Sequence, residues 1–169
     1  MADLFVNKVA ESGIVTLALE ELGGNYLWVD FDLKPFLFME LILKEKDFRE
    51  ALKQQDWAQY EGKLVALYCS ADAIIPVWAY MLVGSYLHPV AKAVMFGPQQ
   101  IARQQWLVQN INAINADEYL GKRIVVKGCG DKPIGEAAYL AAVVKFRPVA
   151  KSIMYGEPCS TVPIYKQKV

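Results

Sequence analysis

The chain has 169 residues, with 18 basic and 18 acidic side chains and a formal net charge of zero. Hydrophobic residues make up 54% of it, which excludes an intrinsically disordered chain, because disorder requires low hydrophobicity and excess charge. The length suits a single α/β domain over residues 1–169. Zero net charge argues against nucleic acid and against an anionic membrane as partners, so we expect neither.

The first 40 residues differ in pattern from the rest of the chain. Residues 13–19 and 26–31 predict two strands, separated by a glycine-containing turn at residues 23–25. We expect these strands to add a hairpin at the edge of a sheet or to exchange between subunits. An amphipathic stretch at residues 41–55 then predicts a helix.

An internal repeat follows this N-terminal part. When the chain is shifted by 59 residues, segment 60–97 aligns with segment 119–156 and gives 13 identities in 38 positions without a gap. Chance would give roughly two or three identities, so the sequence predicts a duplicated unit.

Each copy predicts a strand, a helix and a second strand. Residues 64–68 and 124–126 are short apolar runs that are typical of buried strands. A helix follows and ends before Pro89 or Pro148, and the second strands are expected at residues 93–96 and 152–155. A helix over residues 99–114 joins the copies. This alternation predicts a mostly parallel sheet, with the four turns that leave its strands on one edge.

Residues 73–91 contain no charged side chain over 19 positions, which is close to the length of a membrane span. The second copy places Glu136, Lys145 and Arg147 at equivalent positions. Equivalent helices of one fold should share an environment, so we expect a buried core helix and no membrane span.

Cysteine usage points to a reducing compartment. Cys69, Cys129 and Cys159 are few, odd in number and widely spaced, unlike a secreted disulfide framework. The N-terminus shows no basic region followed by an apolar one, as a secretory signal would, so a cytoplasmic location is expected.

All three cysteines lie in loops that follow predicted strands, where open parallel sheets bind ligands. A thiolate cluster in a cytoplasmic accessory protein is the leading interpretation. Cys69 and Cys129 each precede the predicted start of a helix, whose partial positive charge would lower the pKa of the thiol. The nearby Lys132 would add to this effect. With Asp72, Asp131 or Glu157 as a fourth ligand, the cysteines are candidates to hold zinc or an iron–sulfur cluster, or to carry sulfur.

Two other interpretations stay open. Free cysteine is often a small buried hydrophobe, which would make this a non-catalytic interaction protein with inert thiols. Alternatively, Asp131, Lys132 and Glu136 are candidate catalytic residues of a small-molecule enzyme at the same edge. Asp72 and Asp131, which are identical between the copies, fit a carboxylate pair, but helix N-capping is the favoured explanation.

The hydroxyls of Ser70, Ser160 and Thr161 are candidate cofactor-binding groups, although Ser160 and Thr161 fit backbone capping equally well. The C-terminal tail around them carries Val162 and Ile164, so we expect it to pack back over the loops as a lid or to form another strand.

Residues 42–50, 69–81, 127–133 and 150–165 together resemble the bacterial domain of unknown function 2480 family. The resemblance covers nearly the whole chain and implies no particular activity, because the family has no established function. Genes of this family often neighbour iron–sulfur assembly genes, so the resemblance implies iron–sulfur assembly proteins as candidate partners. It favours the cysteine loops as the functional part of the chain. We also expect a homodimer.

Overall fold

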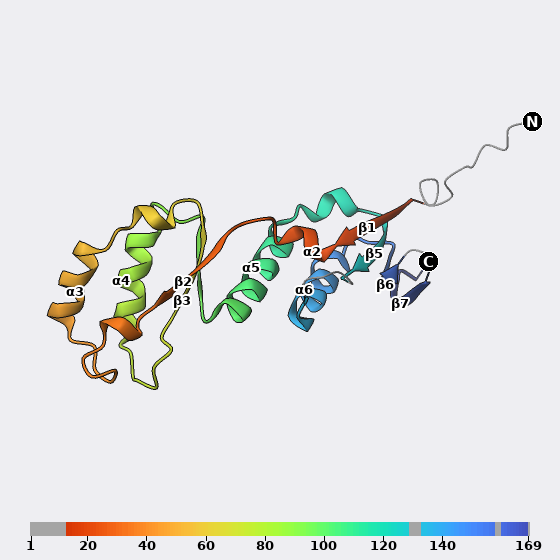
Figure 1. The fold of residues 1–169 in the computed structure, drawn as a ribbon. Coiled ribbons are helices and arrows are strands. Elements are labelled where there is room, and N and C mark those ends of the chain that lie inside the picture. The colour runs from red at the N-terminus through yellow and green to blue at the C-terminus, as the bar shows by residue number, and fades with distance from the viewer. Residues whose placement is uncertain (1–12, 129–132, 158–159, 169) are drawn as a thin grey trace, which may run out of the picture. The chain divides into compact units, whose positions relative to one another are not determined.

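The computed structural model describes residues 13–128, 133–157 and 160–168 (Figure 1). The chain is of mixed α/β type and forms two compact units, one from residues 1–24 and 106–169 and the other from residues 25–105. Among the described residues, no helix is both long and apolar enough to cross a membrane. That both units belong to one domain stays a prediction.

The first unit contains a four-stranded sheet in the order β1-β5-β6-β7. Strands β1 (Ile14–Ala18), β5 (Arg123–Lys127) and β6 (Ser152–Glu157) are parallel, and β7 (Ser160–Lys166) pairs antiparallel with β6. The C-terminal tail is therefore a strand, one of the two outcomes expected for it. The described helices assigned wholly to this unit are α2 (Leu19–Leu22), α6 (Glu136–Phe146) and the 3₁₀ helix η3 (Ala116–Tyr119). Its core includes Ile124, Phe146 and Ile153.

The second unit contains a three-stranded, fully parallel sheet in the order β2-β3-β4. Its strands are β2 (Trp28–Asp32), β3 (Leu64–Tyr68) and β4 (Ala93–Phe96). Helices α3 (Glu45–Gln54) and α4 (Val77–Leu87) and the 3₁₀ helices η1 (Lys34–Phe36) and η2 (Ala58–Tyr60) complete it. Phe31, Phe48, Leu52 and Val83 form part of its core.

Helix α5 (Gln99–Ala113) contributes residues to both units, because the boundary between residues 105 and 106 falls within it. Near its start, the Gln99 amide donates to the Asp30 carboxylate at 3.1 Å, and the Arg103 guanidinium lies over the Trp28 ring. Further along, Leu107 and Ile111 are buried in the core of the first unit.

The same elements recur at the predicted spacing of 59 residues. Helices α4 and α6 both have 11 residues, and they begin at Val77 and Glu136. Gly62 and Gly121 share a left-handed φ of 68°, and their N–H groups donate to the carbonyls of Val90 and Val149. These are correspondences of geometry, and that the two copies arose by duplication stays a prediction.

Three details of the predicted architecture are wrong. The strands form two sheets, so the four turns leave the edges of two sheets and not one common edge. The N-terminal strands form no hairpin, because β1 pairs parallel with β5 and β2 pairs parallel with β3. Each completes a different parallel sheet, and α2 and the following turn carry the chain from one to the other. Helix α4 is also not fully buried, since Val77 and Met81 face solvent.

Candidate functional site

The Asp32 carboxylate binds the loop that follows β3, at the edge of the β2-β3-β4 sheet where the strands end. Asp32 ends β2, and its Oδ1 accepts from the backbone N–H of Ser70 at 2.9 Å and from that of Lys34 at 3.0 Å. The Ser70 hydroxyl donates to Oδ2 of the same carboxylate at 2.5 Å. Asp32 therefore holds the start of the loop that follows β3, 38 residues further along the chain.

Partial burial acts to raise the pKa of Asp32, but the hydrogen bonds from Ser70 and Lys34 and the charge of Lys34 outweigh it, so the pKa lies below its ordinary value. Sequence reasoning missed this residue. The available signal was the acidic alternation of β2, whose sequence WVDFD places Asp30 and Asp32 on the same face near the carboxyl end.

Cys69 lies beside this pair and is half-buried. Its thiol lies 3.8 Å from the carbonyl of Ala71, which is a weak contact. Burial, and secondarily the nearby Cys69 and Asp32, raise the pKa of the Tyr80 phenol above its ordinary value. The Tyr80 ring packs edge-on against Phe96, with ring centroids 5.3 Å apart.

The first unit has a related aromatic arrangement. The Tyr139 ring packs edge-on against Tyr155, with ring centroids 5.6 Å apart. Gly128 stands 59 residues after Cys69, and the Tyr139 hydroxyl occupies the space that a side chain at Gly128 would need. Among the residues that the structure describes, the two sheet edges therefore share aromatic packing.

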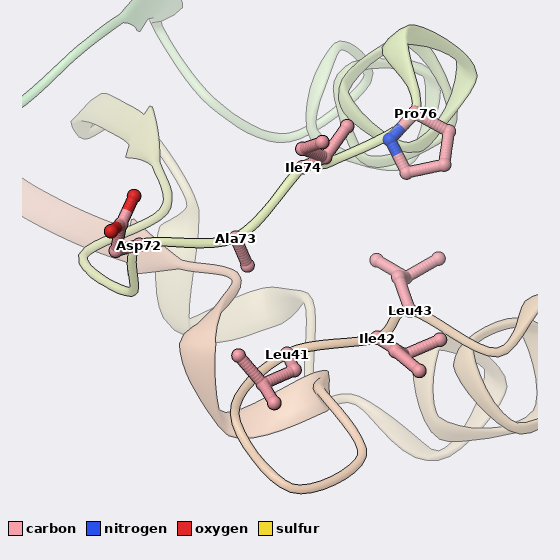
Figure 2. Close-up of a pocket in the computed structure, with 7 residues that line it drawn as sticks. All are labelled: Leu41, Ile42, Leu43, Asp72, Ala73, Ile74 and Pro76. Carbon is pink, nitrogen blue, oxygen red and sulfur yellow. The ribbon is translucent and has the colours of Figure 1, made fainter.

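An apolar pocket of about 450 Å³ opens in the second unit. Figure 2 shows Leu41, Ile42 and Leu43 on one segment, across from Asp72, Ala73, Ile74 and Pro76 on the segment that leads into α4. Asp72 contributes the only charged side chain among the described residues that line it.

The pocket is surrounded by exposed apolar side chains. Ile74 is 94% exposed, and Leu41 and Ile42 are also exposed. Val77 follows directly after Pro76 and is 74% exposed, and Met81 lies one turn further along α4. We call Leu41, Ile42, Ile74, Val77 and Met81 the apolar surface. Exposed apolar side chains that gather around a pocket, as Leu41, Ile42 and Ile74 do, typically mark an interaction site.

The turn that precedes Leu41 has an unusual backbone. Met39 and Glu40 both adopt left-handed φ angles, 51° and 58°, which cost roughly 1–3 kcal/mol each for residues other than glycine. A bridge between Phe38 and Ile42, the ion pair of Lys34 with Glu40 at 3.3 Å, and Lys44 over the Phe38 ring hold the turn. Strain of this kind is often kept at functional sites.

The structure places the predicted site residues Asp72, Ser70 and Glu136 in different surroundings. Asp72 is not the N-cap of α4, because the helix begins at Val77 with Pro76 as its N-cap and without a side-chain cap. The Asp72 side chain makes no capping hydrogen bond to α4 and instead lines the pocket. The Ser70 hydroxyl is bonded to Asp32. Glu136 is the exposed first residue of α6, whose N-cap is Gly135.

The candidates at the C-terminal end lie in or next to β7. Ser160 and Thr161 belong to this strand, and the Thr161 hydroxyl contacts the Met154 sulfur at 3.6 Å. Glu157 forms an ion pair with Lys127 at 3.4 Å. Cys129, Asp131, Lys132 and Cys159 lie outside the described residues.

The cysteine loops belong to different sheets. Cys69 follows β3, whereas the loops that carry Cys129 and Cys159 follow β5 and β6 of the other sheet. Within residues 13–128, 133–157 and 160–168, no group of three or more His, Cys, Asp or Glu side chains could hold a metal ion. The expected zinc or iron–sulfur site, and the catalytic roles of Asp131, Lys132 and Glu136, stay predictions.

Comparison with known proteins identifies a family. The model of a family described as "Protein of unknown function (DUF2480)" matches residues 3–167. No curated protein matches the chain, and no solved structure does.

Proposed function

The chain belongs to the DUF2480 family, whose function is unknown, and from this premise we propose that it is a non-catalytic interaction protein that docks a partner protein on the apolar surface. The observation that carries the proposal is the combination of the 450 Å³ pocket with the exposed Leu41, Ile42 and Ile74 at its mouth. Keeping these side chains in water is unfavourable, and each buried aliphatic side chain contributes about 1.5–3 kcal/mol.

The chemistry of the pocket defines the partner segment. The apolar lining accepts a large aliphatic or aromatic side chain as an anchor. Asp72 is exposed at the pocket and has no ion pair with any other described residue, whereas Glu40 nearby is paired with Lys34. We therefore propose a segment that presents an apolar anchor next to a lysine or arginine, which would meet the Asp72 carboxylate.

A peptide-display selection against the full-length chain tests this directly. We expect the enriched peptides to combine large apolar residues with an adjacent basic residue. Counter-selection on the Ile74→Asp variant removes peptides that bind elsewhere. An enriched set without apolar anchors, or one that binds Ile74→Asp equally well, would refute the proposal.

Affinity measurements then separate the two contributions. By fluorescence anisotropy, Ile74→Asp should weaken binding of the best peptide by at least about tenfold, which corresponds to about 1.4 kcal/mol. Asp72→Lys should weaken it less, and exchanging the basic residue of the peptide for glutamate should restore binding to Asp72→Lys. The control is Leu140→Asp, an exposed position on α6 in the other unit, which should change nothing.

A second candidate function, sulfur handling, is favoured by the position of Cys69 at the carboxyl edge of its sheet, next to the Asp32–Ser70 pair. The Cys69 thiolate would attack the outer sulfur of a small-molecule persulfide. The donor's S–S bond would break, the donor would leave as a thiol after taking a proton, and the sulfur would remain on Cys69 as a persulfide.

Thiol labelling with and without a low-molecular-weight persulfide donor distinguishes the two functions. Sulfur handling predicts rapid labelling of Cys69 in the native protein and a gain of one sulfur atom that Cys69→Ser abolishes. The interaction function predicts slow labelling and no such gain. Elemental analysis of protein purified without oxygen, compared with each of the three single Cys→Ser variants, tests the metal and iron–sulfur alternatives.

A further inference from the structure

The strand β4 has one edge without a partner strand. It pairs with β3 on one side, and among the described residues no strand pairs with its other side. Strand β6 holds the corresponding place in the first unit, parallel to β5 and directly after an 11-residue helix. Its outer edge is covered by β7, which pairs with it in the antiparallel direction.

The two strands also share their local surroundings. Phe96 ends β4, packs against Tyr80 of α4 and stands 59 residues before Tyr155 of β6. Tyr155 packs against Tyr139 of α6 in the same edge-on manner. Because the surroundings agree, β7 indicates what kind of element the outer edge of β4 accepts, namely an antiparallel strand.

The edge of β4 also lacks protection. Its four residues, Ala93–Phe96, include no charged residue and no proline, and Phe96 is 60% exposed. Exposed edge strands in natural proteins usually carry a charge, a proline or a bulge that prevents pairing with another chain. The outer strand of the other sheet has such protection, since β7 contains Pro163 and the β6–β7 pairing has a register irregularity.

We propose that β4 pairs antiparallel with β4 of a second copy, which joins the two three-stranded sheets into one. A two-fold axis perpendicular to a sheet generates antiparallel pairing of identical edge strands. Residues on the same face then lie opposite one another, so Val94 and Phe96 would meet the partner's Val94 and Phe96. Both faces of β4 are apolar, which makes the strand self-complementary.

A second copy fits this edge better than a free peptide. Four residues form few hydrogen bonds, each with a modest net contribution to binding. A flexible peptide would lose backbone entropy for each residue that it orders. The β4 strand of a second copy is already ordered by its own β3, so it avoids most of that loss.

Sedimentation velocity and hydrogen exchange of the full-length protein test the proposal together. We expect a monomer–dimer equilibrium in which those backbone amides of residues 93–96 that face away from β3 lose protection as the protein is diluted and the dimer dissociates. A protein that sediments as a monomer at all concentrations, or a dimer whose β4 amides exchange independently of concentration, would overturn it.

Charge substitutions locate the interface. Phe96→Lys places two like charges close together across the two-fold axis and should raise the dimer dissociation constant by at least about tenfold. Met95→Lys provides a second variant if Phe96→Lys fails to fold, and circular dichroism reports folding for both. Leu140→Lys, an exposed apolar position on α6, is the matched control and should dimerise as wild type does. A dimer that both β4 variants leave intact, or that Leu140→Lys weakens equally, contradicts the proposal.

Discussion

Asp32 shows how one side chain joins distant parts of the chain. Its carboxylate receives two donors from Ser70 and one from the Lys34 backbone, so replacing it leaves these donors without their acceptor. Hydrogen bonds to a charged group typically contribute about 1.5–3 kcal/mol, and the exposure of Ser70 reduces the expected contribution. The residue therefore acts mainly to position the loop that starts at Cys69.

The lowered pKa of Asp32 predicts a pH-dependent stability. Because the pKa in the folded state is below the unfolded value of about 3.9, the carboxylate stabilises the fold fully above that pH and progressively less as pH falls through the folded pKa. Asp32→Asn should cost about 1–2 kcal/mol in urea unfolding at neutral pH, and much less at strongly acidic pH. If the difference in unfolding free energy between wild type and Asp32→Asn stays constant from neutral to strongly acidic pH, the lowered pKa of Asp32 is contradicted. Glu50→Gln, on the exposed face of α3, is the control.

Replacing Gly128 and Gly84 by alanine should change the stability of the protein in opposite directions. A Cβ at Gly128 would collide with the Tyr139 ring and hydroxyl, whereas a Cβ at Gly84 in α4 meets nothing within 4 Å. Gly128→Ala should therefore destabilise the protein by about 1–3 kcal/mol, as overpacking does. Gly84→Ala should stabilise it by about 0.5–1 kcal/mol, because alanine favours the helix. Thermal and urea unfolding of both variants measure the two effects. Changes in unfolding free energy of the same sign for both variants would be inconsistent with this packing.

At the scale of elements, α4 has two apolar faces with different environments. Ala79, Val83 and Leu87 are fully buried against the core, while Val77 and Met81 are mostly exposed. Its sequence is apolar all round, which is typical of a helix buried on every side. The exposed face of α4 belongs to the apolar surface on which we propose that a partner docks.

This asymmetry predicts opposite sensitivities on one helix. Val83→Ala should cost about 1–3 kcal/mol, because it removes buried methyl groups and leaves a cavity. Met81→Lys should change the unfolding free energy by no more than about 0.5 kcal/mol, as surface substitutions usually do. Urea unfolding gives both values. A large loss for Met81→Lys would mean that this face packs within the chain.

At the scale of the whole molecule, the chain builds two separate cores. The core around Phe48 and the core around Phe146 have no buried residue in common. Each lies in one compact unit, and the main chain passes between the units twice, after residue 24 and after residue 105. We therefore expect damage to one core to affect mainly its own unit.

Hydrogen exchange of two matched variants tests this expectation. Phe48→Ala should cost about 3–5 kcal/mol and lower amide protection mainly in residues 25–105. Phe146→Ala should lower it mainly in residues 106–169. Equal losses in both units from either variant would show that they unfold together.

The local part of this fold could be predicted from the sequence. Hydrophobic runs, prolines and glycines mark the strands β3 to β6 and the helices α4 to α6 within a few residues, because these signals act between near neighbours in the chain. The family was also recognisable, since its motifs run along nearly the whole chain.

The tertiary structure decided how these elements pair. The sequence of a parallel strand such as β1 or β2 does not indicate which other strand it will pair with. The division into two sheets and the absence of a hairpin could therefore not be predicted. The Asp32–Ser70 contact spans 38 residues, and the pocket brings residues 41–43 to residues 72–76. Contacts between such distant residues depend on packing free energy summed over the whole core, which no short stretch of sequence contains.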